Sequence, residues 1–429
     1  MEPLAPNYDI AYRSPDPHKD FPYSPSILII PETGRYVLSY DLSDIYGEVR
    51  ISDDKGKTWT KKAERKFCHA RVFRDGDRLY VLGHKKDLVI FYSDDFGETW
   101  SEEHFLTQGE TWNGCAAGVW YKDNYVYMAM DAYFLNEGET MPSFWNPNII
   151  APTVLRGKLG TDLTKRENWL FSEKVRFRDI IKGEDEIKDI GVPFFPTQAT
   201  KPQDEECTYW PPDYRKNYDF ENDKPGIKFH FHLSGWLEAN IVQITDPKHY
   251  WYDKTGKTFH IFMRANTGGT GYGCVMKAVE RFVDGKEVIN IECVTNPSGK
   301  RVVFLPFPGG QMKFYIKYDE KTKLYWLASS QARDSMTRIE YLSEDRFNVP
   351  CDERDRLVLH FSKNLVDWCF AGLVDQSGAD KQSRHYASMD IDGDDLIIVS
   401  RSGDKDAHSA HDGNILSVHR VTNFRELVY

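Results

Sequence analysis

A carboxylate and a guanidinium stand at the same end of two neighbouring strand-like runs in the middle of the chain. Glu238 lies at the entrance of the run LEANIVQI, and Arg264 ends the next such run, FHIFMR. A carboxylate at a strand entrance can accept a proton in catalysis, and an arginine beside it can bind an acidic group of a substrate. The same pair also fits a salt bridge across a surface hairpin.

Polar residues are concentrated near the C-terminus, in a protein whose other strand-like runs are apolar. The stretch SRSGD contains Arg401, and AHSAHDGN contains His408, His411 and Asp412. Histidines three residues apart could bind a metal or supply a general base, but no third ligand stands at a suitable spacing. We therefore predict no metal site. The alternative role of His411 and Asp412 is to order the last loop by hydrogen bonding.

The elements that must position these residues are β-strands. Short apolar runs bounded by Gly, Pro, Asp and Asn recur along the chain, for example ILII, YVLSY, YVYMAM and LIIVSR. Two segments are nearly identical, SDDKGKTW from Ser52 and SDDFGETW from Ser93, and each follows a strand-like run. Their separation of 41 residues suits one four-stranded blade of a β-propeller.

The shared motif S-x-D-x-G-x-T-W resembles the Asp-box of sialidase-like propellers. There the aspartate caps a tight hairpin, the glycine takes a positive φ and the tryptophan packs between blades. Degenerate copies follow at 161–163 with Trp169 and at 362–365 with Trp368. The C-terminal stretch with HDGN and HRVTNFR also resembles a bacterial group of uncharacterised sialidase-like proteins. We predict an all-β fold, a six-bladed propeller that forms one domain over residues 1–429.

Residues 135–235 interrupt the rhythm of strands, because they are rich in Pro, charged and aromatic residues. We expect a long loop insertion there. It is either a surface decoration or a set of loops that wall a ligand pocket.

Composition limits the classes of partner. A formal net charge of −11 argues against nucleic-acid and anionic-membrane partners, which require basic clusters. No apolar run approaches the roughly 18 residues of a membrane span, and the N-terminal residues do not resemble an export signal. The 7 cysteines include no CxxC pair, which favours buried thiols. We expect a cytoplasmic protein without a cofactor, with a secreted mature form as the alternative. The oligomeric state stays open.

The resemblance implies a catalytic pair. In sialidases a glutamate on a segment similar to that of Glu238 activates a tyrosine nucleophile. The run RHYASMDIDGD resembles the sialidase segment that carries this tyrosine, so Tyr386 is the candidate nucleophile. Tyrosine is a poor nucleophile at its ordinary pKa of about 10, so Glu238 would accept its proton. The alternative is a tyrosine that only packs within a blade.

The resemblance also implies an arginine cluster that binds a substrate carboxylate. Arg264 matches one member, and Arg354 matches a second, since it precedes Ser362 in the pattern R-x-x-L-x-x-x-x-S. Tyr23 stands where the first arginine belongs. Either Arg401 replaces that arginine or the substrate is a different sugar. The predicted substrate-binding set is Arg264, Arg354, Arg384, Arg401, Tyr23, His411 and Asp412.

The general acid of sialidases is an aspartate on the loop before the first Asp-box strand. Here the segment YDLSD offers Asp41 and Asp44, and Asp41 directly at the strand end is the better candidate. Such a group must be kept protonated near neutral pH by burial. An aspartate that caps the loop is the alternative.

Together these residues predict an exo-acting, retaining glycoside hydrolase that releases a terminal acidic sugar from a glycan. A second class is a uronate lyase or a rhamnosidase that uses His and Tyr. A third is a propeller that binds carbohydrate without turnover.

Overall fold

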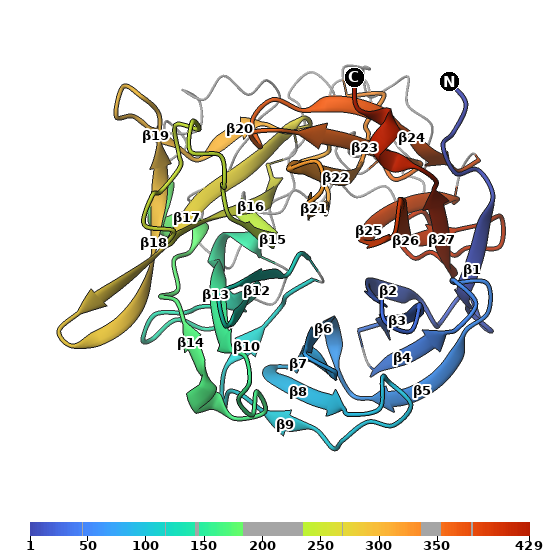
Figure 1. Cartoon of the computed structure of the whole chain (residues 1–429), viewed down its shortest axis with the longest axis horizontal. Helices are drawn as coiled ribbons and strands as arrows, with labels where there is room; N and C mark the ends of the chain where they lie inside the picture. The colour runs from blue at the N-terminus through green and yellow to red at the C-terminus, as the bar shows by residue number, and fades with distance from the viewer. Residues whose placement is uncertain are drawn as a thin grey trace, which may run out of the picture.

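The computed structural model describes residues 1–44, 46–115, 117–141, 146–182, 235–267, 269–335, 353–378 and 381–429. Over these residues the chain forms six antiparallel sheets, which are arranged as blades around a common axis (Figure 1). The prediction of a six-bladed β-propeller is therefore confirmed.

The first three blades follow one another along the chain. Blade 1 contains β2 (Pro22–Ile30), β3 (Arg35–Leu42), β4 (Tyr46–Ser52) and β5 (Thr60–Arg65). Blade 2 contains β6 (Cys68–Asp75), β7 (Arg78–Lys85), β8 (Asp87–Ser93) and β9 (His104–Phe105). Blade 3 contains β10 (Thr111–Trp112), β11 (Trp120–Lys122), β12 (Tyr125–Tyr133), β13 (Ile150–Lys158) and β14 (Trp169–Phe171).

The remaining blades complete the ring. Blade 4 contains β15 (Gly235–Val242), β16 (Thr258–Asn266), β17 (Tyr272–Val283), β18 (Lys286–Thr295), β19 (Arg301–Val302) and β20 (Phe304–Pro306). Blade 5 contains β21 (Tyr315–Asp319), β22 (Leu324–Ser330), β23 (Arg356–Ser362) and β24 (Cys369–Gln376). Blade 6 contains β25 (Ser383–Asp392), β26 (Asp395–Gly403), β27 (Ile415–Val421) and β1 (Tyr8–Arg13). The short helices are η1 (Pro147–Ile149), η2 (Arg166–Asn168), α1 (Phe177–Ile180) and η7 (Phe424–Leu427).

Blade 6 joins the two ends of the chain. Strand β1 pairs antiparallel with β27, with Tyr8 opposite His419. The first strand of the chain thus forms the outer edge of the blade whose other three strands come last. Backbone hydrogen bonds therefore close the ring, in addition to side-chain packing.

Apolar side chains pack between neighbouring blades at all six interfaces. Between blades 6 and 1, for example, Tyr36 packs in one cluster with Ile397 and Leu416. Because both faces of a blade are covered in this way, its middle strands are buried along most of their length, as β7 illustrates. This packing explains the continuous apolar runs of the sequence.

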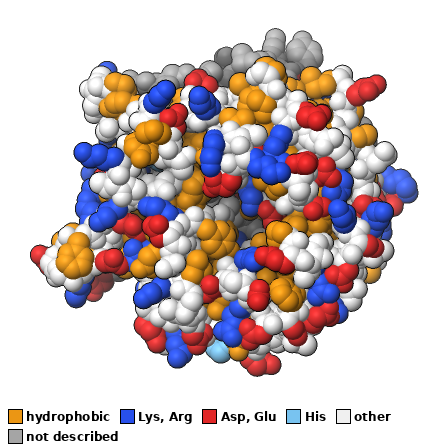
Figure 2. Space-filling model, viewed as in Figure 1, with side chains coloured by type: hydrophobic (Ala, Val, Ile, Leu, Met, Phe, Trp, Pro, Cys, Tyr) orange, Lys and Arg blue, Asp and Glu red, His pale blue; other side chains and the backbone are white. Residues whose placement is uncertain are grey.

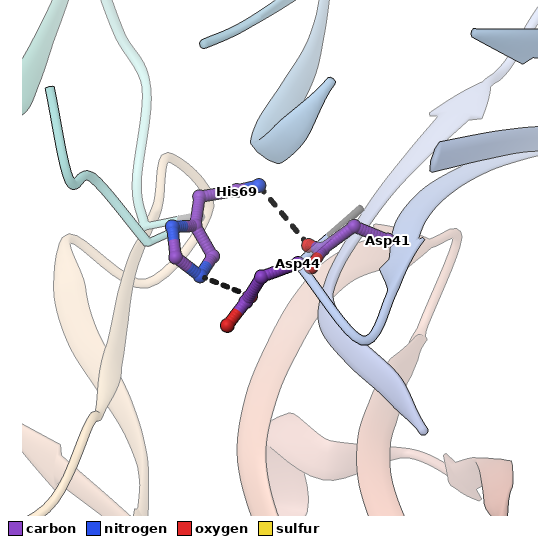
Figure 3. Close-up of side chains that lie close together, drawn as sticks. All are labelled: Asp41, Asp44 and His69. Carbon is purple, nitrogen blue, oxygen red and sulfur yellow. Dashed lines mark hydrogen bonds and ion pairs between the residues drawn. The ribbon is translucent and has the colours of Figure 1, made fainter. Parts of the chain in front are cut away.

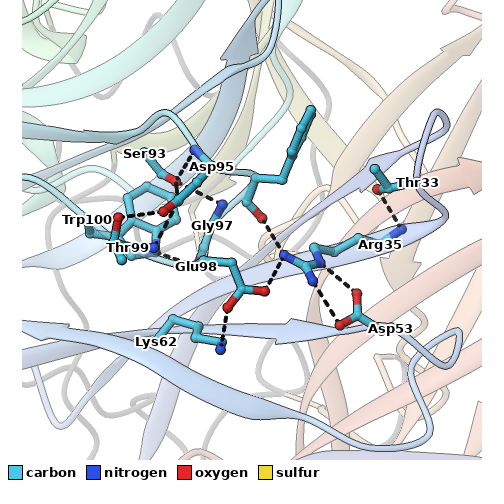
Figure 4. A network of polar contacts seen from close by, with 11 residues as sticks. Thr33, Arg35, Asp53, Lys62, Ser93, Asp95, Gly97, Glu98, Thr99 and Trp100 are labelled. Atoms are coloured by element: carbon cyan, nitrogen blue, oxygen red, sulfur yellow. Dashed lines mark hydrogen bonds and ion pairs between the residues drawn. The ribbon is translucent and has the colours of Figure 1, made fainter.

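The two repeated segments form hairpin loops with the same hydrogen bonds. In the second loop, the Ser93 hydroxyl accepts from the Gly97 N–H at 2.8 Å, and Asp95 accepts from the Thr99 N–H at 2.9 Å (Figure 4). Gly97 has a φ of 91°, a conformation that favours glycine. The first loop repeats these bonds with the corresponding residues. The motif therefore encodes a local turn.

The second loop also links blade 2 to blade 1. The Arg35 guanidinium at the start of β3 binds Asp53 at 2.6 Å and Glu98 at 2.7 Å (Figure 4). Glu98 in turn accepts from Lys62 of blade 1 at 2.6 Å. The Trp100 ring packs against the apolar cluster that blades 1 and 2 share. The loop thus supports the contact between blades.

The predicted insertion at 135–235 is in part a blade. Strands β13 and β14 and helix α1 fall inside this range, and the two strands complete blade 3. Residues 183–234, which include the stretch rich in Pro and aromatics, lie outside the described residues.

Acidic and basic side chains are interspersed over the face of the propeller that Figure 2 shows. The hairpin of β17 and β18 projects beyond the ring (Figure 1), and Phe282 near its tip is 70% exposed. In the described parts of the chain, no helix combines the length and the apolar character that crossing a membrane requires.

Candidate active site

Four innermost strands carry the same irregularity near the axis. The pairing of β2, β6, β15 and β25 with the next strand is shifted within the first few residues of each strand. At the shift, Ser24, His69, Glu238 and Tyr386 have φ values of 48°, 51°, 62° and 53°. A non-glycine residue held at positive φ costs about 1–3 kcal/mol, and such strain is concentrated at functional sites. The four residues occupy equivalent positions in their blades.

Two of these residues meet through an arginine. The Arg264 Nη1 donates to the Tyr386 hydroxyl at 2.9 Å and lies 3.5 Å from Glu238 Oε1. Tyr386 belongs to blade 6 and Glu238 to blade 4, so these contacts join two blades that are not neighbours in the ring. Both side chains are buried. The second carboxylate oxygen of Glu238 has no hydrogen-bond partner within the described residues, and it is available to accept a proton.

Electrostatics keep Tyr386 protonated in the resting protein. Burial raises its pKa above the ordinary value of 10, and the charge of Glu238 raises it further. The guanidinium groups of Arg264 and Arg354 act in the opposite direction. The Tyr386 side chain is therefore a neutral phenol that lies among arginines and one carboxylate.

Three guanidinium groups surround the Tyr386 side chain. Besides Arg264, the guanidinium of Arg354 lies 5.6 Å from the centroid of the Tyr386 ring, and that of Arg401 lies 5.4 Å from it. Arg401 also stacks on the Tyr23 ring at 3.6 Å. The tyrosine at the expected position of the first arginine therefore supports a guanidinium that comes from β26. Arg354 is further held by His385, whose Nδ1 lies 2.9 Å from its Nη1.

The C-terminal loop fixes Arg401. Its Nη2 lies 3.0 Å from His411 Nδ1 and 3.4 Å from an Asp412 carboxylate oxygen, which also accepts from the Tyr23 hydroxyl. Burial opposes the charge of Asp412, but hydrogen bonds with His411 and Tyr23 hold its pKa below the ordinary value. Burial and the charge of Arg401 lower the pKa of His411 to about 4. His411 and Asp412 thus order the loop around the arginine.

Asp41, Asp44 and His69 form a second polar group (Figure 3). Asp41 is fully buried, and one of its oxygens accepts from the His69 N–H at 3.0 Å. The His69 Nε2 lies 3.2 Å from Asp44, and its Nδ1 lies 3.0 Å from the Nε2 of His84. The other oxygen of Asp41 has no hydrogen-bond partner within the described residues.

The pKa values in this group diverge. Burial raises the pKa of Asp41 to about 7, although the charge of His69 opposes this rise. Burial would lower the pKa of His69, but the contact with Asp44 and the charges of both aspartates raise it to about 9. The pKa of His84 falls to about 3, through burial and then the charge of His69. Near pH 7 a protonated fraction of Asp41 therefore stands beside an imidazolium.

Asp41, Asp44 and His69 could in principle hold a metal ion, because their ligand atoms lie within 4.8 Å of one another. Burial would lower the pKa of His69, but the two aspartates raise it, so a metal ion would have to displace a proton from its ring. The group is better suited to hold protons.

Arg384 lies apart from the site. Its Nε donates to Asp375 of β24 at 2.6 Å, its Nη1 donates to the Ser383 and Gly403 carbonyls, and its guanidinium stacks on Tyr8 at 4.6 Å. Strands β24 and β1 are the outer strands of blades 5 and 6. The structure therefore does not bring the Arg384 guanidinium together with Tyr386 and the other three arginines.

Sequence reasoning missed several residues of the site. His69 occupies the position in blade 2 that Glu238 and Tyr386 occupy in theirs, and an alignment of the blades was the signal that could have found it. Lys313 is fully buried, and its Nζ donates to the Ala387 carbonyl at 2.7 Å. Burial lowers the pKa of Lys313 to about 8. Cys115 lies 3.0 Å from the Ser24 hydroxyl and packs against Tyr386.

Comparison with solved structures identifies the fold. No protein-family model matches the sequence, and no curated protein matches it. The intramolecular trans-sialidase from Ruminococcus gnavus, solved with oseltamivir carboxylate, matches with a TM-score of 0.51 and 11% identity over 98% of each chain. A protein of unknown function from Dyadobacter fermentans matches with a TM-score of 0.51 and 10% identity over 97% of this chain and 98% of that chain. The chain thus has the sialidase-like six-bladed propeller fold, and at these identities the likeness concerns the fold alone.

Proposed function

We propose that this protein is an exo-acting, retaining glycoside hydrolase that releases a terminal acidic sugar from a glycan. The observation that carries the proposal is the set of three arginines around Tyr386, with the Glu238 carboxylate held beside the same arginine that binds the tyrosine hydroxyl. A tyrosine that only packs within a blade would not require three guanidinium groups around it, whereas a site for an anionic sugar would.

Tyr386 acts as the nucleophile and Glu238 as its base. Arg264 contacts both groups through the same nitrogen, so the phenol and the carboxylate are held at one guanidinium. As the tyrosine oxygen attacks the anomeric carbon, Glu238 takes up its proton, and a glycosyl–tyrosine bond replaces the bond to the leaving group. A phenol enters this step neutral, so it does not repel an anionic sugar.

Arg264, Arg354 and Arg401 bind the acidic group of the sugar. Guanidinium–carboxylate contacts are strong and directional, and three guanidinium groups near one buried tyrosine form a site for an anion. Arg401 supplies the charge that Tyr23 lacks. Its stack on the Tyr23 ring and its contact with Asp412 hold it in position for this role.

Asp41 is the acid/base. With a pKa near 7, a substantial fraction of Asp41 is protonated at neutral pH and can donate to the leaving-group oxygen. The ionised form then activates the water that releases the sugar from Tyr386. His69, held cationic by Asp44, stabilises the carboxylate that forms when Asp41 gives up its proton.

One observation favours a second candidate, a uronate lyase. His411 is neutral at pH 7 and lies beside Arg401 and Tyr23, so the loop offers a base, a cation for a uronate carboxylate and a phenol. A lyase would form an unsaturated product that absorbs in the ultraviolet, with no covalent intermediate. A third reading, binding without turnover, predicts that no glycan is consumed.

The test is a panel of aryl glycosides, including a sialoside, with the wild type and Tyr386→Phe. We expect release of the aryl alcohol from an acidic glycoside and a loss of at least about 10²-fold in kcat on removing the hydroxyl. Tyr318→Phe is the matched control, because its hydroxyl contacts Thr245 away from the site. Ultraviolet absorbance with uronate polysaccharides, unaffected by Tyr386→Phe, would instead favour the lyase.

A further inference from the structure

A pocket opens beside the acid/base group, between the starts of blades 2 and 3. Its volume is about 420 Å³, within the range of about 300–1,000 Å³ that is common for small-molecule sites. Asp44 and His69, which face Asp41, also line this pocket. A group that receives a proton from Asp41 therefore has this pocket directly next to it.

The charges of the pocket are mainly positive. Lys66, Lys85 and Lys86 line it together with His69. The ammonium of Lys85 is paired with Glu103, and His69 is paired with Asp44. Lys66 and Lys86 are exposed, and no ion pair joins either of them to another described residue. Among the described residues, neither of these two ammonium groups has an ion-pair partner at the pocket.

The residues that line the pocket include two aromatic side chains. Phe67 and Trp112 contribute to the lining, and both are almost fully buried. The Trp112 indole N–H has no hydrogen-bond partner within the described residues. Aromatic side chains together with nearby ammonium groups suit a sugar ring that carries an anionic substituent.

We propose that this pocket binds the leaving group of the substrate and selects one that carries a carboxylate, sulfate or phosphate. This inference rests on the proposed function, since it assigns the leaving-group side of the same reaction. The terminal sugar lies against Tyr386 and the arginines. The next sugar lies over Asp44 and His69, with its acidic substituent directed to Lys66 and Lys86.

The kinetic test uses two disaccharides with the same terminal acidic sugar, one ending in galactose and one in galactose 6-sulfate. We expect the wild type to prefer the sulfated substrate, and Lys66→Ala/Lys86→Ala to lose about 3- to 10-fold in kcat/KM on it alone, as expected for two exposed ion pairs. Salt should reduce the preference. Lys57→Ala/Lys300→Ala, which removes two exposed lysines outside the pocket, is the control. Equal kcat/KM values for both substrates in the wild type would overturn the inference and leave the hydrolase proposal intact.

A binding test separates the two proposals if no hydrolysis is seen. Galactose 6-sulfate, galactose 6-phosphate, glucuronic acid and galactose are titrated calorimetrically into the wild type and Lys66→Ala/Lys86→Ala. Binding of an anionic sugar that is stronger than that of galactose, and is weakened about 3- to 10-fold in the variant, supports the pocket even without turnover. The three anions show which acidic group it prefers. No binding, or equal binding of galactose and the anions, contradicts the inference.

Discussion

At the scale of single residues, the cations around Tyr386 come from different parts of the chain. Arg264 lies in β16 of blade 4, Arg354 lies two residues before β23, and Arg401 belongs to β26. Tyr23 provides an aromatic surface for Arg401 where an arginine was expected. Three guanidinium groups therefore lie near Tyr386, as in the sialidase pattern that the sequence resembles. One of them, Arg401, comes from a different part of the chain than that pattern predicts.

Arg401→Ala should weaken recognition of the acidic sugar. Hydrogen bonds to charged groups contribute about 1.5–3 kcal/mol, so we expect kcat/KM on the acidic substrate to fall about 10- to 100-fold, mostly through KM. A glycoside that lacks the acidic group should be hydrolysed equally well by variant and wild type. Arg281→Ala, on the exposed β17–β18 hairpin, is the control. An equal loss on both substrates would show that Arg401 maintains the fold of the site and does not bind the anion.

Asp41→Asn should separate activity from stability. The pKa of Asp41 in the folded protein, about 7, exceeds its ordinary value of 3.8, so the folded state binds the proton more tightly than the unfolded state. The contribution of Asp41 to stability therefore falls as the pH rises through this interval. We expect the variant to lose activity, yet to unfold at an equal or higher temperature than the wild type at pH 8, with a smaller difference at pH 5.

Thermal unfolding at the two pH values, together with hydrolysis rates, checks this prediction. We expect a chelator to leave the wild-type rate unchanged, because the proposed acid/base role of Asp41 requires no metal. Marked destabilisation of Asp41→Asn at pH 8, or loss of activity with the chelator, would contradict the assignment of Asp41 as acid/base.

The role of single residues was only partly predictable from the sequence. Glu238, Tyr386 and Asp41 stand in short segments that resemble sialidase segments, so this resemblance identified them as candidates. His69 has no such segment, and its role depends on Asp44 and His84, which reach it only in the folded chain. Arg384 stands two residues before Tyr386 in the sequence, but its guanidinium contacts Asp375 of blade 5, and this contact forms only in the folded chain.

At the scale of elements, the bulges of the innermost strands create the site. A regular strand would direct alternate side chains into the two interfaces between blades. The shifted pairing at Glu238 and Tyr386 interrupts this alternation, so that one side chain in each strand does not enter an interface between blades. The same device at Ser24 and His69 indicates that the site extends around the ring.

Asp95→Ala should destabilise the protein without changing its kinetics. The carboxylate of Asp95 accepts from the Thr99 N–H and hydroxyl and from Ser93, and the loop braces blade 2 against blade 1. Loss of these bonds should lower the free energy of unfolding by about 1–3 kcal/mol. Denaturant unfolding measures this change, with Asp77→Ala as a control at another surface turn. If Asp95→Ala is fully folded but its kcat is much lower than that of the wild type, the loop also affects catalysis, which contradicts this prediction.

At the scale of the whole molecule, the propeller brings distant segments to one axis. Glu238 lies in blade 4 and Tyr386 in blade 6, the two blades on either side of blade 5, and both residues contact the same arginine. The pairing of β1 with β27 keeps the ring closed. The repeated loops are local, so the sequence was sufficient to predict the blades. The contacts of Arg264 with Tyr386 and Glu238 depend on how the blades pack together, and no local sequence pattern encodes this packing.

The most direct test of the proposed mechanism is to trap the covalent intermediate. The protein is incubated with a fluorinated glycosyl fluoride of the acidic sugar that it hydrolyses, and its peptides are analysed by mass spectrometry. We expect one added sugar on the peptide that contains Tyr386, and no label in Tyr386→Phe. A label on another residue, or continued hydrolysis without any label, would contradict the assignment of Tyr386 as the nucleophile.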